Sequence, residues 1–386
     1  MGRKETAIMN KRINSIEFLR FVFCLVVVNY HFYSHYLVKG VHRHFFCRGY
    51  IADEFFFAVS GFFIAKKATN TKTENIGGFT ANYLIRRIKK IALPYYICWF
   101  GSFIGIHLMK YWNSTGLIKL GGKYEISDSV FINLLNSIYE LTFLDMFGFK
   151  KGMYSNQVAW YFSALMICIL ILTPFMIRYK NAFCLVAAPL ISFSAYAFLS
   201  LKYDYLFSPH TVIDGLYIYK GMIRAVAGIC GGAFLFGLIN MKPREYLINK
   251  VMERVIVLLL WIGILLYSLF PFESNYTETA IQYDYIVAIL IIIALGITFH
   301  LDSMKNEGRL TKNKTFTRIT DYMGSLSVYV FFAQSILYSF DKFIFILDIS
   351  TLKKLLLFNL TAILLAIALK VFCEKIRSKN NDESRL

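Results

Sequence analysis

Two ionisable residues, Arg20 and His31, interrupt an apolar stretch near the start of the chain, at residues 16–36. The stretch has the length of a membrane-spanning helix, which needs about 20 mostly apolar residues. Because the two residues are eleven positions apart, an α-helix places them on one face, about 16 Å apart along its axis. A histidine there is suited to general-base catalysis at neutral pH. The structural alternative is an arginine that reaches the inner headgroups and a histidine satisfied by a neighbouring helix.

A cluster of cations, Arg86, Arg87, Lys89 and Lys90, precedes the third apolar stretch. Arginine side chains match phosphate oxygens well, so the cluster is suited to hold a phosphate-rich cytosolic molecule. The alternative is an orienting role, because basic residues on the cytoplasmic side fix the direction of helices and attract anionic headgroups.

Two further charged residues lie near the ends of apolar stretches, Glu54 and Arg224. Glu54 is placed to orient a histidine or to bind a hydroxyl group of a substrate. The alternative is a solvated carboxylate at the membrane interface. Arg224 either extends to the headgroups or pairs with a carboxylate such as Glu54. His31 and His35 have the spacing of metal ligands on a helix, but no carboxylate is in register, so we expect no metal.

The composition defines the class of protein in which these residues act. The chain has 386 residues, of which 57% are hydrophobic and only 17% charged, with a mean hydropathy of +0.52. Soluble domains are less apolar and more charged. The net charge of +18 is spread over the ends of apolar stretches, which argues against nucleic-acid binding. The seven cysteines form no CxxC pair, so neither a disulfide framework nor a zinc site is indicated.

We therefore predict an all-α, polytopic membrane protein with about ten transmembrane helices. A cytoplasmic arm (1–15) precedes the membrane domain (16–374), and a cytoplasmic tail (375–386) follows it. Residues 66–90 are expected to form a basic loop, and residues 131–149 an interfacial helix within the longest loop. Lys and Arg are about twice as frequent on one side as on the other, which predicts that both termini are cytoplasmic. The expected spans are 16–38, 51–65, 91–109, 157–177, 182–201, 218–240, 254–272, 281–300, 319–341 and 352–373.

Six motifs in a fixed order give the chain a resemblance to a known family. Arg20 and His31 are followed by EFFFAVSGFFIA, YLIRRIKKIALPYY, NQVAWYFSALMI, MIRAVAGICGGAFLFG and GSLSVYVFFAQSIL. This series resembles the bacterial membrane-bound acyltransferase-3 family over nearly the whole chain. The resemblance implies transfer of an acyl group, commonly acetyl, from cytosolic acyl-CoA to a hydroxyl of an extracytoplasmic sugar or polysaccharide. It also implies a multi-pass protein of the bacterial cytoplasmic membrane that works without a metal.

The same resemblance implies roles for individual residues. His31 corresponds to the family's essential histidine, with Arg20 and Glu54 as its catalytic partners. The implied acyl-CoA-binding residues are Arg86, Arg87 and Lys90, and the implied substrate-binding residues are Trp160, Arg224, Ser325, Tyr329 and Gln334. Two positions depart from the family's pattern, because Phe332 and Val158 stand where many members have a histidine.

Two other functions compete with acyl transfer. A polysaccharide or glycolipid transporter would also carry ionisable residues inside its helices, although the chain shows no paired repeats of the kind that transporters use. An inactive relative that assists a polysaccharide synthase is the third possibility, and the retained His31 argues against it. The sequence names neither the acceptor nor the oligomeric state.

Overall fold

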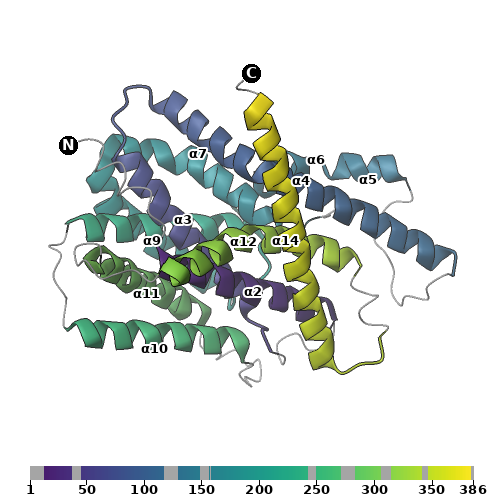
Figure 1. Ribbon diagram of the computed structural model, residues 1–386. Coiled ribbons are helices and arrows are strands. Elements are labelled where there is room, and N and C mark those ends of the chain that lie inside the picture. The colour runs from purple at the N-terminus through teal and green to yellow at the C-terminus, as the bar shows by residue number, and fades with distance from the viewer. Residues whose placement is uncertain are drawn as a thin grey trace.

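The computed structural model describes residues 13–36, 45–116, 129–147, 156, 158–241, 249–270, 283–305, 314–340 and 347–383. Over these residues the fold is a bundle of helices with a single hairpin of two short strands, which confirms the predicted all-α class (Figure 1). The long helices, in chain order, are α2 (Asn14–Tyr36), α3 (Ala52–Thr69), α4 (Ile76–Ser114), α7 (Ala159–Ala182), α8 (Ala188–Lys202), α9 (Lys220–Met241), α10 (Lys250–Leu269), α11 (Tyr283–Lys305), α12 (Lys314–Ser339) and α14 (Thr351–Glu383).

Short elements connect some of these helices. They are the 3₁₀-helices η2 (Gly49–Ile51) and η3 (Asp145–Phe147), the helices α5 (Val130–Asn136) and α6 (Ile138–Leu141), the π-helical segment η4 (Phe183–Ala187), and the strands β1 (Val212–Ile213) and β2 (Ile218–Tyr219). The strands pair antiparallel between α8 and α9.

Seven helical segments in the described part of the chain are long and apolar enough to cross a membrane, so the protein is a multi-pass membrane protein. Residues 159–202 count as one of the seven, although Lys180 has a non-helical φ of 42° and interrupts them. α3 and α12 coincide with predicted spans but are not among the seven. All ten predicted spans contain a helix, and the number that cross the bilayer stays a prediction.

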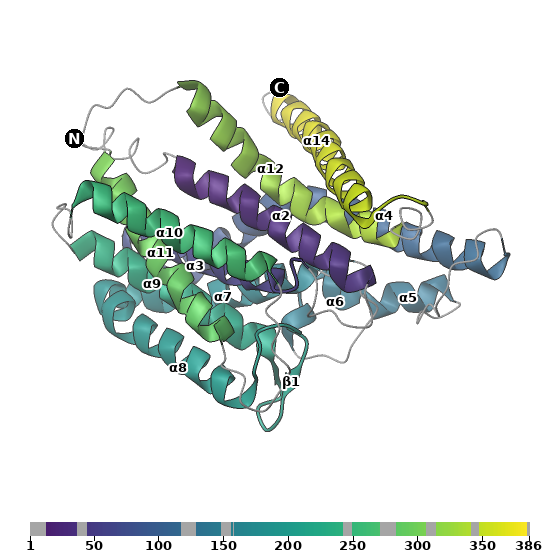
Figure 2. The ribbon, with the colours of Figure 1, turned by 90° about the horizontal axis from the view of Figure 1, so that it is seen from below.

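Helices α2 and α12 run parallel, side by side (Figure 2). At one end the Asn14 amide donates to the Thr317 hydroxyl over 3.0 Å. Towards the other end the Tyr338 hydroxyl donates to the Val28 carbonyl over 3.0 Å. Because the helices keep the same direction and register, residues on α2 and α12 about 305 positions apart lie at the same height in the bundle.

Helix α4 lies on another side of α12 and has the same direction. The Tyr95 and Phe332 rings are 5.6 Å apart, and nearer the far end the Ser102 and Ser339 hydroxyls are 2.6 Å apart. Because α2, α12 and α4 are parallel, the position of a residue along one helix shows which residues of the other two lie at the same height in the bundle.

Helices α3 and α9 approach each other so closely that glycine is required at the contact. A Cβ atom on Gly61 would overlap the carbonyl of Ile229, and one on Gly232 would overlap the carbonyl of Ala58. Small residues permit this kind of backbone contact between helices in a membrane, where packing provides much of the attraction. The contact lies in the middle of both helices and holds α3 against α9.

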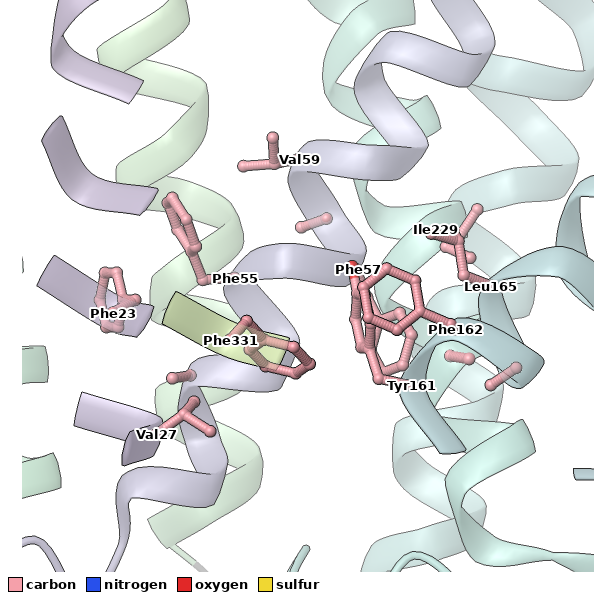
Figure 3. Packing of buried hydrophobic residues seen from close by; sticks show 14 of the residues in the cluster. Phe23, Val27, Phe55, Phe57, Val59, Tyr161, Phe162, Leu165, Ile229 and Phe331 are labelled. Atoms are coloured by element: carbon pink, nitrogen blue, oxygen red, sulfur yellow. The ribbon is translucent and has the colours of Figure 1, made fainter. Parts of the chain in front are cut away.

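Aromatic rings fill the space around α3 (Figure 3). Phe23 and Phe55 stack with ring centroids 4.6 Å apart on one side, and Phe57 and Tyr161 stack at 4.6 Å on another. Phe331 of α12 reaches the Tyr161 ring at 6.0 Å. Buried aromatic pairs of this kind contribute roughly 0.5–1.5 kcal/mol each beyond the area they bury, so α2, α3, α7 and α12 form one packed core.

The predicted basic loop at 66–90 is wrong except at residues 70–75, because α3 continues to Thr69 and α4 runs without a break from Ile76 to Ser114. The Asn75 side chain caps the helix by accepting from the Gly78 amide at 2.7 Å. Pro94 lies inside the helix and has no N–H for the carbonyl of Lys90, four residues earlier. That carbonyl accepts a hydrogen bond from Arg377 of α14 instead, so it is not left without a donor.

The predicted interfacial helix at 131–149 is divided in the structure into the short pieces α5, α6 and η3, and its position at the interface stays a prediction. Two buried carboxylates lie in these pieces. Glu140, 2% exposed, accepts from the Trp99 indole at 2.7 Å and from the Asn156 amide at 3.2 Å. The chain turns at Phe143, where φ is 58°, so that Asp145 also points inward. Beyond the membrane domain, α14 continues as a helix to Glu383, through most of the predicted tail.

Candidate functional site

A cavity of about 300 Å³ lies where α3, α7 and α9 begin and α2 approaches its end. The basic-residue bias predicts that this end faces outward, so we name the cavity the outer cavity. Its wall contains His31, Asp53, His210 and Arg224, together with aromatic residues such as Trp160. A hollow of about 560 Å³ between α10 and α11 is larger but is lined by aliphatic residues and one tyrosine.

Arg224 is the centre of a buried ion-pair network in this wall. It is 0% exposed, and its Nε donates to Glu54 at 2.8 Å, while its Nη2 lies 3.5 Å from the Asp53 carboxylate. Its guanidinium stands 5.4 Å from the centre of the Trp160 ring. The Tyr196 hydroxyl donates to the other oxygen of Glu54. Of the two alternatives for Arg224, the structure has the pairing with Glu54, and Glu54 is buried rather than solvated.

Residues around Tyr50 support the network from the side of α11. The Arg224 Nη2 donates to the Tyr50 carbonyl at 3.0 Å, and the Tyr50 hydroxyl donates to Asp284 at 2.8 Å. Asp284 also accepts from the Leu206 amide at 2.8 Å and from the Tyr267 hydroxyl at 2.6 Å. Burial, and then the neighbouring Asp284 carboxylate, raise the pKa of Tyr50 well above its usual value, so the phenol stays protonated and keeps donating.

His31 is held between two tyrosines at the cavity. Its ring centre is 5.1 Å from that of Tyr30 and 5.6 Å from that of Tyr338. The Tyr338 hydroxyl is fixed by the carbonyl of Val28 and lies 3.1 Å from the Gln334 amide oxygen. Gln334 is 0% exposed. This predicted substrate-binding residue therefore reaches His31 through Tyr338.

The second predicted catalytic residue on α2, Arg20, lies three turns before His31. It is within 3.4 Å of Glu17, and its side chain is 32% exposed. Arg20, Arg87 and Asp53 all lie near enough to the hydroxyl of Tyr161 to act on it electrostatically. The Tyr161 hydroxyl in turn lies 3.3 Å from that of Ser60. Tyr161 and Ser60 thus occupy the interior between Arg20 and the outer cavity.

The cations predicted to bind acyl-CoA lie on α4, and we name Arg86, Arg87, Lys89 and Lys90 the basic face of α4. Arg86, Lys89 and Lys90 are exposed, while Arg87 is partly buried. Arg87 donates to the Tyr83 hydroxyl at 2.9 Å. Because α4 and α12 are parallel and in register, this face lies at the height of residues 323–327 of α12. That height is also the height of Arg20 on α2.

Ser325 and Tyr329, predicted to bind the substrate, lie apart from the outer cavity. Ser325 donates to the Tyr322 carbonyl at 2.8 Å. Tyr329 is 7% exposed, and its hydroxyl interacts with Arg377 of α14, the residue that also binds the Lys90 carbonyl. The structure thus divides the predicted substrate residues, with Trp160 and Arg224 at the outer cavity and Ser325 and Tyr329 nearer the basic face of α4.

Several residues of the site were missed in the sequence. Asp53 and His210 line the outer cavity, Asp145 binds His210 at 2.8 Å, and Tyr196 binds Glu54. Only Asp53, next to Glu54 in the first turn of α3, carried a local signal. The others come from connections between helices and from the middle of an apolar helix. His35 falls outside the described side chains, and among those described no three potential metal ligands gather.

A multi-pass helical bundle with a histidine in a polar cavity, and an arginine three turns earlier on the same helix, fits an enzyme that works within a membrane. The family model for the acyltransferase domain, Acyl_transf_3, matches residues 13–374. The chain belongs to this acyltransferase family and is a membrane acyltransferase. A comparison with curated proteins finds no match, and neither does one with solved structures.

Proposed function

We propose that the protein transfers an acyl group, acetyl in the first instance, from cytosolic acyl-CoA to a hydroxyl of an extracytoplasmic sugar or polysaccharide. The observation that carries the proposal is the division of polar groups along α2. His31 lines the outer cavity, whereas Arg20 lies at the height of the basic face of α4. A donor from the cytoplasm and an acceptor from outside would then meet along one helix, in the cytoplasmic membrane of a bacterial cell.

On the donor side, the phosphates of acyl-CoA are expected on Arg86, Arg87 and Lys90. Exposed cations on one helix face suit several phosphates at once. The extended pantetheine arm then carries the thioester past Arg20 and into the bundle. Ser325 and Tyr329, beside this face, are expected to contact the donor rather than the acceptor, which changes the role that the sequence suggested.

On the acceptor side, His31 is the proposed general base. Its imidazole nitrogen takes the proton of the acceptor hydroxyl while the oxygen forms a bond to the thioester carbonyl carbon. The C–S bond then breaks, and the thiolate receives the proton from His31, so that free CoA and an acyl ester result. Arg224 places a permanent positive charge in the same cavity wall, where it favours the negative charge that develops on the carbonyl oxygen. Trp160 offers its ring for stacking on a sugar.

The test is mass spectrometry of the surface glycans from three strains: wild type, a deletion, and the deletion complemented with His31→Ala. We expect an acyl mass increment in the wild type that is absent from both mutants. Complementation with His107→Ala is the matched control, because His107 lies on α4 away from the outer cavity and should leave the increment in place.

A different result would favour the transporter. If the glycans keep their mass while their export fails in the deletion, and His31→Ala restores export, the acyl-transfer proposal is wrong. The increment itself, where present, identifies the acyl group.

A further inference from the structure

One nitrogen of the buried Arg224 guanidinium has no hydrogen-bond partner within the described part of the chain. Its Nε donates to Glu54 and its Nη2 donates to the Tyr50 carbonyl, but its Nη1 is buried and unpaired. Arg224 lines the outer cavity. Buried donors are almost always hydrogen-bonded, because an unmet donor costs the free energy of its desolvation. The Nη1 atom therefore indicates a ligand oxygen that binds in the cavity.

Asp53 places a hydrogen-bond acceptor beside this donor. Its carboxylate lies 3.5 Å from the Arg224 Nη2, its side chain is 10% exposed, and it lines the same cavity. An ionised carboxylate has about four lone-pair positions, and Arg224 is its one hydrogen-bonding partner among the described residues. The Asp53 carboxylate can therefore accept further hydrogen bonds from a ligand.

The neighbouring carboxylate, Glu54, does not have this capacity. It is 1% exposed, its Oε1 accepts from Arg224, and its Oε2 accepts from the Tyr196 hydroxyl. Glu54 is also absent from the wall of the outer cavity. Of the two acids that pair with Arg224, Asp53 is thus the one that faces a ligand.

The charges indicate which kind of ligand group fits between Nη1 and Asp53. Two carboxylates pair with one guanidinium here, so a carboxylate or phosphate of a ligand would meet a like charge at Asp53. A hydroxyl meets no such repulsion. Its oxygen accepts a hydrogen bond from Nη1, and its hydrogen is donated to Asp53. The pair therefore suits a neutral hydroxyl group.

We propose that Asp53 and the Nη1 of Arg224 form a subsite for a hydroxyl of the acceptor, other than the hydroxyl that His31 deprotonates. The inference rests on the proposed function and adds the acceptor's chemistry, which is a neutral, polyhydroxylated group with a second hydroxyl near the acylated one. Trp160 stands 5.4 Å from the same guanidinium and covers one face of the sugar. A site that binds a hydroxyl through buried polar groups rejects strongly an analogue that lacks it.

Asp53 can be replaced without leaving the buried arginine unpaired. Arg224 keeps its 2.8 Å bond to Glu54, and the positive charge that acts on the reacting carbonyl is unchanged. Loss of Asp53 also removes the repulsion between two adjacent carboxylates. A purely structural Asp53 therefore predicts little effect on acceptor binding, whereas a binding Asp53 predicts a large one.

The experiment uses the purified full-length protein in lipid nanodiscs, radiolabelled acetyl-CoA, and the polysaccharide fraction extracted from deletion cells as acceptor. For Asp53→Ala we expect the acceptor KM to rise about 10- to 100-fold, the loss of a hydrogen bond to a charged group, with no change in the acetyl-CoA KM. Asp53→Asn keeps one acceptor oxygen and should raise the acceptor KM only a few-fold. Arg224→Lys keeps the charge beside Glu54 but lacks Nη1, so the acceptor KM should rise about tenfold.

Asp204→Asn is the matched control for the Asp53 variants. Asp204 follows α8, is exposed and is not part of the cavity wall, so both KM values should equal those of wild type. A second measurement, made without acetyl-CoA, reports acceptor binding alone. The polysaccharide fraction should raise the melting temperature of wild type and of Asp204→Asn, but not that of Asp53→Ala.

The outcomes separate this inference from the proposed function. An unchanged acceptor KM in both Asp53 variants overturns the subsite while acyl transfer stands, and Nη1 then binds water only. A rise in both KM values together with a lower melting temperature assigns Asp53 to the fold, and a shift of equal size in Asp204→Asn also overturns the inference. If wild type transfers no acetyl group, the proposed function fails, and the melting measurement then decides the subsite. If Arg224→Lys does not fold, the two Asp53 variants decide.

Discussion

The outer cavity and the basic face of α4 are built in opposite ways. The cavity gathers side chains from α2, η2, α3, α7, α9 and the segment before β1, and its arginine is fully buried. The basic face consists of neighbouring residues on one helix, of which Arg86, Lys89 and Lys90 are exposed. One region depends on the whole fold, and the other needs only that α4 is a helix.

The difference corresponds to two kinds of recognition. Buried charges must be matched by partners at short distance, because an unpaired charge in a low-dielectric interior is costly. Such a site is rigid and selective, as a site for one hydroxyl of a sugar should be. Exposed cations act additively and tolerate rearrangement, which suits the binding of a flexible, highly charged donor. Four predictions test whether the two regions differ in this way.

The largest effect is expected from His31→Ala. Loss of a general base should lower kcat for acyl transfer by about 10²- to 10⁴-fold, while the acetyl-CoA KM changes little because the basic face is intact. Steady-state kinetics in nanodiscs measure both constants. His107→Ala should retain wild-type kcat, and an equal loss in the two variants would mean that His31 has no special chemical role.

Removal of the buried cation should affect stability most. Arg224→Met leaves Glu54 and Asp53 in the core without their counter-charge, and breaking a buried pair costs about 3–5 kcal/mol. The melting temperature in detergent should therefore fall sharply. The double variant Arg224→Met with Glu54→Gln should recover part of the loss, because it removes one of the stranded charges. Arg86→Met, on the basic face, should melt as wild type does; a comparable fall there would remove the contrast between the regions.

Neutralising the basic face should weaken donor binding in a graded manner. We expect the triple variant of Arg86, Arg87 and Lys90 to glutamine to raise the acetyl-CoA KM by about 10- to 100-fold, and the single variants by a few-fold each. The wild-type KM should also rise with salt, since exposed charges are screened, and the triple variant should lose that dependence. Lys67→Gln, an exposed lysine at the far end of α3, is the control. An unaltered KM in the triple variant would assign the cluster to membrane orientation alone.

The two regions also differ in how well the sequence predicts them. Arg86, Arg87 and Lys90 are adjacent, so their shared face follows from the helix period. Arg20 and His31 likewise share one helix, and α2 confirms their common span. The pairing of Arg224 with Glu54 was one of two alternatives, because two helix ends at a membrane boundary do not reveal whether they touch. The structure shows that the two side chains meet, because glycines allow α3 and α9 to pack closely.

His210 and Asp145 had no signal in the sequence. They lie 65 positions apart, Asp145 in the stretch predicted to be an interfacial helix and His210 in a segment without a motif, and they meet only because β1, β2 and η3 fold onto the ends of α7 and α9. The basic cluster was predicted in a loop for a related reason. The predicted span began at residue 91, after the last cation, and the bond from Arg377 to the Lys90 carbonyl that compensates for Pro94 comes from a residue 287 positions further along the chain.

The smallest effect is expected where the two regions are joined, at Tyr338 on α12. Tyr338→Phe keeps the ring that packs beside His31 but removes the hydroxyl that binds the Val28 carbonyl and Gln334. The His31 imidazole stays in the cavity, and only the hydrogen bonds that hold the neighbouring Tyr338 ring are lost. We therefore expect kcat to fall about three- to tenfold, with both KM values close to wild type. Tyr111→Phe, at an exposed position on α4, should leave kcat unchanged. A rise in the acetyl-CoA KM for Tyr338→Phe would instead mean that the donor's acyl end reaches past Arg20 and contacts this hydroxyl directly. The donor-binding region would then extend to Tyr338 of α12 instead of ending between Arg20 and His31.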